Sequence, residues 1–512
     1  MKTMELLDAI LDPELDRSTW QQWRGWVREL SDEEYRGLIE GLAAAGEKLA
    51  EPRIESNLER VLPVLVERQV AVAGPQSWIV SSIGTLYVHS RSETNLRNLW
   101  LGWLAQIGSD AALEAWLDLV REAPPKHRVG LVAAFGPLVN RFNLPRWFYT
   151  RLVDDAMRHS QTAAATLDLI NFHVRRGVLE EHPAAAHAVR LTSLLEQVVQ
   201  RLHEIEQGES PYAANPAHLQ LVVSDSIALV VSLCDTLAMS HELASAEAIA
   251  QAMQLRHRRI QCEAAAALAR LDVELGRQRL IELASEPVMR LQVLAYAEEL
   301  EILHCVPEQQ RSDLAIAESR LALWLADPQR VGLAPSRMEL VEFRELNWPS
   351  FEHPVGVYLF RYYYGTGPDA TSNIGIVGPM VHAFERDIGA MSLEDVLAAF
   401  AGWQAVHDDI YEVSLAEFRA QYPQLITQRE RLLAGCEFED VQWLFAGSMM
   451  GEWILVGAAC LAGERGFIML DEYRVTWFAA DADPEMTGQW AYMVYRGRRM
   501  LQAFNDDFES PD

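Results

Sequence analysis

Several features that would identify a specific chemistry are scarce or missing in this sequence. The chain has five cysteines, which are widely separated and include no Cys-x-x-Cys pair, so neither a disulfide framework nor a zinc knuckle is expected. It has no Gly-x-Ser-x-Gly elbow, no His-Glu-x-x-His helix and no glycine loop ending in Gly-Lys-Ser/Thr. Because these are the common signatures of hydrolases, metalloproteases and phosphate-binding loops, we expect no enzyme and no cofactor.

Basic residues are also few compared with acidic ones. The chain has 44 basic against 73 acidic side chains, a formal net charge of −29, and only three of the basic residues are lysines. The field of such a chain repels nucleic-acid phosphates and anionic membrane surfaces. Neither nucleic acid nor a membrane is therefore an expected partner. The one compact basic run, residues 256–259, is interpreted as a solvated helix edge or as a source of salt bridges between repeats.

No export signal or membrane span is expected. Acidic residues interrupt the N-terminal segment before an apolar stretch of signal-peptide length develops. The most apolar segment, residues 219–239, contains Asp225 and Asp235, which favours a buried helix over a membrane span. The expected location is the cytoplasm.

Helical patterns and short Pro, Gly and Asp breaks alternate from Glu93 to about Glu301. Candidate first helices of successive pairs begin near Glu93, Pro125, Thr162, Pro216, His257 and Pro287. Their mean separation is roughly 39 residues, close to the ~40 to 47 residues typical of HEAT and armadillo repeats. The spacing predicts stacked helix pairs, and an ordinary helical bundle is the alternative.

The clearest unit joins an alanine-rich helix at 258–271, a short break and a second helix at 276–284. Small residues allow helices to approach closely, and leucines fill the layer between them. This unit resembles a repeat of the bacterial HEAT-repeat proteins, which are armadillo-type α-solenoids. The order of features in 347–350 and 372–379 is similar to C-terminal regions of uncharacterised members, a resemblance that implies no activity.

The predicted fold class is mainly α, with a HEAT-like α-α solenoid followed by a C-terminal α+β domain. Residues 1–92 are expected to form a helical N-terminal capping region, in which Ser31 and Glu34 make a capping box. Residues 93–326 form the predicted repeat array, and residues 336–505 form the α+β domain. The boundary is placed between Ala326 and Pro335.

The last third contains five strand-like runs, at 355–364, 453–460, 467–470, 473–478 and 490–495. A turn at 462–466 predicts a hairpin between the second and third runs. The glycines at 365–369 and 375–379 are interpreted as turns, and residues 392–407 predict a helix with Ser392 as its N-cap.

A group of histidines and acids in this domain is the candidate site. His382 and Glu385 follow a Gly-Pro turn, and His407, Asp408 and Asp409 follow the predicted helix. Two imidazoles with several carboxylates are sufficient for a divalent metal or for acid–base chemistry. The alternative is that these residues form salt bridges and a capped helix end. Asp408 and Asp409 would lie at the negative end of the helix dipole, and a nearby arginine could compensate their charge just as a metal could.

Our leading functional hypothesis is a non-enzymatic scaffold or adaptor that binds a protein or peptide partner through its solenoid. The alternative is an enzyme or metal-binding module in the C-terminal domain that uses the His382 and His407 cluster. A self-assembling structural component is a third possibility, and the sequence leaves the oligomeric state open.

Overall fold

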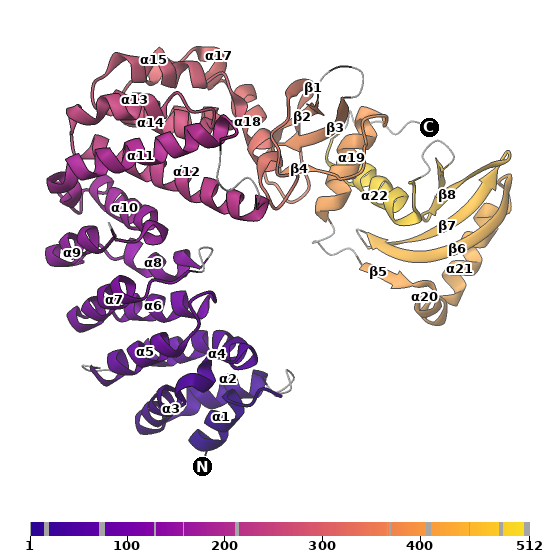
Figure 1. The fold of residues 1–512 in the computed structure, drawn as a ribbon. Coiled ribbons are helices and arrows are strands. Elements are labelled where there is room, and N and C mark those ends of the chain that lie inside the picture. The colour runs from indigo at the N-terminus through magenta and orange to yellow at the C-terminus, as the bar shows by residue number, and fades with distance from the viewer. Residues whose placement is uncertain are drawn as a thin grey trace. The chain divides into compact units, whose positions relative to one another are not determined.

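The protein is mainly helical, and its C-terminal part contains two antiparallel sheets, as the sequence predicts (Figure 1). The computed structural model describes residues 2–14, 20–70, 77–126, 130–156, 158–209, 215–365, 367, 370–405, 411–449, 451–480 and 485–505. The chain divides into two compact units. The first comprises Met1–Leu283 with Ala295–Leu303, and the second comprises Ala284–Leu294 with His304–Asp512.

The first unit is built from helices, which are α1 (Lys2–Ile10), α2 (Trp20–Glu29), α3 (Asp32–Ala44), α4 (Pro52–Val70), α5 (Ser77–His89), α6 (Leu96–Ile107), α7 (Asp110–Glu122), α8 (Leu131–Val139), α9 (Arg146–Ala156), α10 (Ser160–Arg175), α11 (Ala188–Glu206), α12 (Pro216–Met239), α13 (Ala246–Ala252), α14 (Arg258–Arg270) and α15 (Glu274–Leu283). Helices α4, α6, α8, α10, α12 and α14 follow one another side by side in one layer. Helices α3, α5, α7 and α9 contact one another in the same way and form a second layer (Figure 1).

The helix starts expected from the sequence period all fall in the even-numbered series. They correspond to α6, α8, α10, α12, α14 and α16 (Pro287–Glu299). Five of the six begin within three residues of the expected position, and α8 begins six residues later than Pro125. The sequence period therefore locates the start of every second helix from α6 to α16.

Close packing explains the alanine-rich sequence of α14. Its residues from Ile260 to Ala269 are all buried. A Cβ atom on Gly276 of α15 would lie 2.6 Å from the carbonyl oxygen of Ala265, so no larger residue fits at that crossing. Small residues thus bring α14 and α15 together, as expected.

Helix α12 holds the most apolar segment. Among the described residues it is the one helix long and apolar enough to cross a membrane by length and composition, and 61% of its most apolar window is buried inside the protein. A buried core helix of a water-soluble protein has the same properties, so this helix is weak evidence for a membrane span.

The capping residues predicted from the sequence are in place. At the start of α3, the hydroxyl of Ser31 accepts a hydrogen bond from the amide of Glu34, whose carboxylate accepts from the Ser31 amide. At the start of α19 (Leu393–Gln404), the hydroxyl of Ser392 accepts from the amide of Asp395. Both N-cap predictions are confirmed.

The second unit contains two antiparallel sheets whose strands follow chain order. The first sheet comprises β1 (Arg337–Leu346), β2 (Val355–Tyr364), β3 (Thr371–Val377) and β4 (Val381–Ala383). The second comprises β5 (Tyr411–Ser414), β6 (Phe438–Met449), β7 (Glu452–Leu461), β8 (Glu464–Leu470) and β9 (Val475–Ala479). This unit also contains the first part of α16. Its complete helices are α17 (Glu308–Arg311), α18 (Asp313–Ala326), α19, α20 (Leu415–Gln421), α21 (Pro423–Leu433) and α22 (Gly488–Phe504).

Each sheet carries apolar side chains on both faces. In β2, Leu359 packs in the cluster formed with α19, whereas Phe360 and Tyr362 pack with Leu321 and Leu325 of α18. The second sheet packs against α22 on one face and against α20 and α21 on the other. Burial on both faces explains why β2 and β7 are nearly continuous apolar runs.

Helices α19 and α22 cross at two glycines. A Cβ on Gly497 would lie 1.8 Å from the carbonyl oxygen of Ala398, and a Cβ on Gly402 would lie 2.0 Å from that of Met493. Neither position tolerates even a methyl group without a backbone shift. This crossing joins the cores of the two sheets, since residues of both helices occur in both cores.

Two predictions for this unit are wrong. Residues 490–495, predicted as a strand, belong to α22, where Thr487 is the N-cap and the buried positions Ala491, Tyr492, Val494 and Tyr495 follow helical spacing. Residues 375–377, predicted as part of a turn, belong to β3, where Gly375 lies against Leu321 of α18. Aromatic residues favour strands, but tertiary packing overrode that preference in α22.

Candidate functional site

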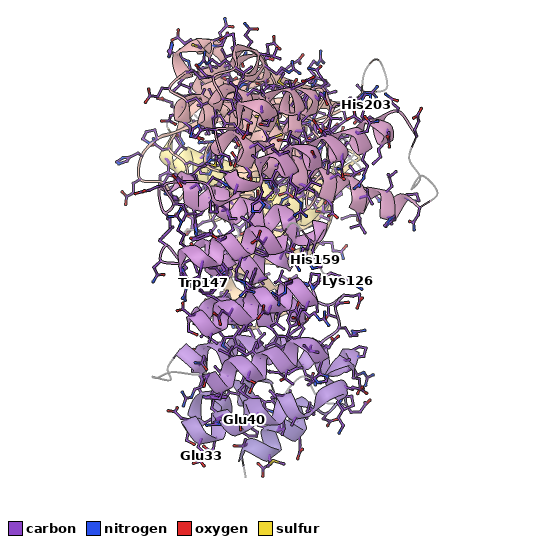
Figure 2. The ribbon with its side chains drawn as sticks, turned by 60° about the vertical axis from the view of Figure 1, so that its left-hand side comes forward. Glu33, Glu40, Lys126, Trp147, His159 and His203 are labelled. Atoms are coloured by element: carbon purple, nitrogen blue, oxygen red, sulfur yellow. The ribbon has the colours of Figure 1, made fainter. Side chains whose placement is uncertain are left out.

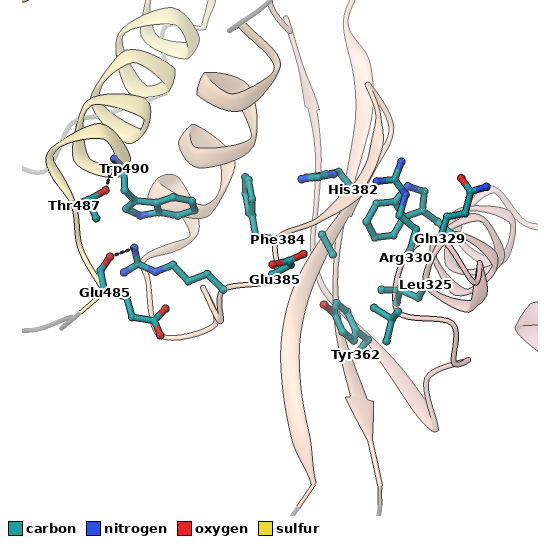
Figure 3. Close-up of a pocket in the computed structure, with 14 residues that line it drawn as sticks. Leu325, Gln329, Arg330, Tyr362, His382, Phe384, Glu385, Glu485, Thr487 and Trp490 are labelled. Carbon is teal, nitrogen blue, oxygen red and sulfur yellow. Dashed lines mark hydrogen bonds between the residues drawn. The ribbon is translucent and has the colours of Figure 1, made fainter. Parts of the chain in front are cut away.

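A pocket of about 520 Å³ in the second unit contains the predicted residues His382 and Glu385 (Figure 3). It lies between the end of α18, the turn that follows it, the first sheet and the start of α22. Its lining residues are Trp324, Leu325, Gln329, Arg330, Val331, Tyr362, His382, Ala383, Phe384, Glu385, Arg386, Glu485, Thr487 and Trp490. A volume in this range suits a small organic ligand.

His382 lies in β4 and is surrounded by aromatic rings. Its imidazole stacks on the indole of Trp403, with centroids 4.0 Å apart and planes inclined by 14°. The rings of Trp324 and Phe384 meet it edge-on at 5.5 Å and 5.0 Å. Burial, reinforced by the nearby charge of Arg330, lowers the pKa of His382 to about 4, so the imidazole is neutral at pH 7.

Two arginines of the pocket each lie over a tryptophan ring. The guanidinium of Arg330 lies 5.0 Å from the ring centroid of Trp324, and that of Arg386 lies 4.7 Å from that of Trp490. Arg386 also donates a hydrogen bond of 3.1 Å to the backbone carbonyl of Glu485 (Figure 3). Burial lowers the pKa of Arg386. Stacking on an indole fixes a guanidinium in one plane and leaves its edge available for hydrogen bonds.

Asn373 of β3 holds the segment that carries Phe384, Glu385 and Arg386. Its side-chain amide donates to the carbonyl oxygens of Phe384 and Arg386, at 2.9 Å and 2.8 Å. Its side-chain oxygen accepts from the amide of Ile388 at 3.1 Å. Because this buried side chain both donates hydrogen bonds to the backbone of the segment and accepts one from it, it fixes the backbone on one side of the pocket.

The structure brings together two of the five predicted site residues. His382 and Glu385 line the same pocket, whereas His407, Asp408 and Asp409 lie outside the described residues. Within the described parts of the chain, no group of three or more His, Cys, Asp or Glu side chains is placed to hold a metal ion. The metal cluster as a whole therefore stays a prediction.

An arginine does occupy the end of α19. Arg496 of α22 is buried and donates a hydrogen bond of 2.7 Å to the carbonyl oxygen of Gly402 in the last turn of α19. Burial lowers the pKa of Arg496. A cation at the C-terminal end of a helix offsets the helix dipole. From the sequence, either an arginine or a metal could have this role.

A second polar cluster, which the sequence did not predict, connects helices of the first unit. Asp235 of α12 is buried and accepts hydrogen bonds from Arg175 of α10 and Arg270 of α14. Arg270 also forms two hydrogen bonds, of 3.0 Å and 2.9 Å, with Glu299 of α16. Burial raises the pKa of Asp235, and the two arginines oppose that shift.

Further hydrogen bonds extend this cluster along the same helices. Ser232 of α12 donates to Asp168 of α10 at 2.6 Å, and the hydroxyl of Tyr296 of α16 donates to Glu263 of α14 at 2.5 Å. Burial raises the pKa values of both Asp168 and Glu263. All these groups have protein partners, so the cluster joins adjacent helices.

The pocket is therefore the better candidate for a ligand site. Its residues come from elements far apart in the chain, and its two arginines and two tryptophans carry no motif that sequence reasoning could recognise. No protein-family model matches the chain, and a search of curated proteins found no match.

Proposed function

We propose that the first unit is a HEAT-like α-solenoid and that the protein is a non-enzymatic scaffold or adaptor for a protein or peptide partner. The observation that carries the proposal is the agreement between the sequence period and the even-numbered helices, which lie side by side. Repeats that stack on their neighbours present a long continuous surface, and binding partners along it is the usual role of such arrays.

Contacts between successive helix pairs support the repeat interpretation. Arg141, which follows α8, donates to the carbonyl oxygens of Gln106 and Gly108 at the end of α6, both at 2.8 Å. His159, which follows α9 and is labelled in Figure 2, donates from Nε2 to the carbonyl oxygen of Arg121 in α7 at 2.8 Å. In each case one pair satisfies helix-end carbonyls of the preceding pair.

A deletion of one complete helix pair tests the repeat architecture. Removing residues 96–130, which contain α6 and α7, should leave a folded and soluble chain, because each repeat of a solenoid contacts only its neighbours. Circular dichroism should show the remaining helices, and size-exclusion chromatography should show no aggregation. An ordinary bundle has no such repeat to remove, so complete loss of helical structure would contradict the proposal.

The net charge of −29 favours a partner surface that is basic or mixed, and we place the complex in the cytoplasm. Affinity capture with the full chain, followed by quantitative mass spectrometry at low and high salt, tests this proposal. The expected result is a stoichiometric protein whose recovery falls as salt rises. A native lysate that yields no stoichiometric partner would count against the scaffold role, and light scattering distinguishes a second copy of this chain from a different protein.

A metal-binding module in the second unit is the second candidate function. Two observations favour it: His382 and Glu385 line one pocket, and the imidazole is in the neutral form that binds metals. Isothermal titration of the full chain with Mg²⁺, Mn²⁺ and Zn²⁺ tests it, with His382→Phe as a variant that keeps an aromatic ring. Absence of binding, or equal binding by the variant, would remove this candidate.

A further inference from the structure

The pocket that contains His382 has the walls of a site for a ring-shaped ligand. Tyr362 and Phe384 lie along its length, with Arg330 at one end and Trp490 at the other (Figure 3), and Trp324 also lines it. Phe384 meets the ring of Trp490 edge-on at 5.1 Å and stacks on Phe400 at 4.8 Å. Neighbouring rings therefore hold these aromatic side chains in place, which limits the entropy lost when a planar ligand binds.

One cation of the pocket is available to an anion. The guanidinium of Arg330 lies over Trp324, and no carboxylate among the described residues forms an ion pair with it. It is exposed at the rim of the pocket. A guanidinium presents a planar fork of N–H groups that matches a carboxylate with two parallel hydrogen bonds.

An indole closes the other end of the pocket. Trp490 lies under the guanidinium of Arg386 and meets the ring of Phe384 edge-on, and its own N–H is buried. The pocket thus offers a guanidinium at the Arg330 end and aromatic rings along the rest of its length.

Two acids limit the charge of the ligand. Glu385 and Glu485 line the pocket together with Arg330 and Arg386, so the four formal charges cancel. A dianion such as a phosphate monoester would meet repulsion from both carboxylates, whereas a monoanion pairs with one guanidinium at lower cost. The lining therefore favours a single carboxylate over a phosphate.

We propose that this pocket binds a small aromatic carboxylate, with the carboxylate on Arg330 and the ring between the aromatic side chains. The same chemistry occurs in free aryl acids and at the end of a peptide whose last residue is aromatic. The proposal is independent of the scaffold role, because it concerns only side chains of the second unit.

Isothermal titration of the full chain with three probes tests the ligand class. Phenylacetate should bind at one site, whereas phenylacetamide, which lacks the charge, and acetate, which lacks the ring, should each bind at least about tenfold more weakly. If phenylacetate does not bind, or binds no better than acetate and phenylacetamide, the proposal is overturned. Inorganic phosphate that binds more tightly than phenylacetate would also overturn it.

Two arginine variants test the position of the carboxylate. Arg330→Gln should weaken phenylacetate binding by about tenfold to a hundredfold, the loss expected for a charge-assisted hydrogen bond, and should leave phenylacetamide binding unchanged. Arg337→Gln is the matched control, because Arg337 also lies over an aromatic ring of the same unit, that of Tyr363, but does not line the pocket. If Arg330→Gln binds phenylacetate as well as Arg337→Gln does, the assignment is wrong.

A pair of peptides distinguishes the two ligand sources. Peptides ending in phenylalanine, with a free or an amidated C-terminus, compete with phenylacetate in the same titration. A free-carboxyl peptide that binds more tightly than phenylacetate assigns the pocket to chain ends, and weaker binding assigns it to free acids. Equal competition by the amidated peptide would contradict the role of the carboxylate.

Discussion

Arg290 should be the most sensitive single position in the packing of α16 against α17 and α18. The side chain is 3% exposed. Its guanidinium donates to the carbonyl oxygens of Ala284 and Ala315, the side-chain oxygen of Gln310, the carboxylate of Glu318 and the hydroxyl of Ser319, at distances between 2.7 and 2.9 Å. Replacing Arg290 with methionine keeps most of the volume and removes every one of these bonds.

The expected loss of stability depends on the carboxylate of Glu318, which loses its partner in this variant. Removing one partner of a fully buried ion pair costs about 3 to 5 kcal/mol, because the other charge stays buried. Glu318 is 25% exposed, so water can reach its carboxylate and the cost falls towards the lower limit. We expect Arg290→Met to lower the free energy of unfolding of the protein by about 3 kcal/mol.

Urea denaturation followed by circular dichroism measures this change, and hydrogen exchange of the α18 amides localises it. The control is Arg320→Met, since Arg320 is exposed on α18, and a surface change of this kind should stay within about 0.5 kcal/mol. Arg290→Lys keeps the charge but loses the fork geometry, so it should lie between the two. A loss below about 1 kcal/mol in Arg290→Met would refute the reasoning, because buried hydrogen bonds of this number cannot be lost at so little cost.

Three further predictions concern other parts of the chain. Asn373→Leu should destabilise the second unit by about 3 kcal/mol and speed hydrogen exchange in the segment after β4, because two carbonyls and one amide lose their partner; unchanged exchange would contradict the role of Asn373. Burial lowers the pKa of His182 to about 4, so protonation of this imidazole destabilises the folded state. The stability contributed by the neutral imidazole is complete above about pH 6.5, and up to about 3 kcal/mol of it is lost as the pH falls towards 4. Urea titrations at several pH values should therefore show a weaker acid sensitivity in His182→Gln than in the wild type, with the exposed His203→Gln as control. Gly497→Ala should lower the free energy of unfolding by at least about 2 kcal/mol, because the added methyl group meets the backbone of Ala398. Gly84→Ala lies in open space on α5 and should raise the free energy of unfolding by about 0.5 to 1 kcal/mol. Equal effects of the two changes in thermal unfolding would refute the argument that α19 and α22 need glycine at their crossing.

Local signals in the sequence were sufficient for some elements. The turn between β7 and β8 is one of them, since Ala462 and Gly463 both adopt positive φ, of 51° and 86°, and the Ala-Gly-Glu-Arg-Gly segment between two apolar runs has the residues that a tight turn needs. The N-caps Ser31 and Ser392 are another, because the capping bond joins residues three positions apart. Such elements depend on neighbours in the chain.

Elements whose partners are distant were harder to predict. Strand β1 is rich in glutamate, leucine and arginine, which favour a helix, and it becomes a strand by pairing with β2. The apolar run at 490–495 contains residues that favour strands, but the glycine crossing with α19 requires a helix there. In both cases the deciding contact lies outside the segment.

The candidate site shows the same division. His382 and Glu385 are recognisable as polar residues three positions apart, and the structure does place them in one pocket. Arg330 and Trp490 are separated by 160 positions in the chain, so no sequence pattern indicates that they line the same space. Asp235 did carry a signal, because an acid inside an apolar helix requires a partner, but the sequence alone does not identify Arg175 and Arg270 as that partner.

Helix α16 belongs to both compact units: residues 287–294 are part of the second and residues 295–299 part of the first. Helical segments of this length are marginal on their own in water, since nucleating a helix costs more than a few hydrogen bonds return. Melting of either unit therefore removes the support of a helix that the other unit needs. We expect a calorimetric scan of the intact chain to show a single heat-absorption peak, and a protein cut inside this helix to lose both halves of it.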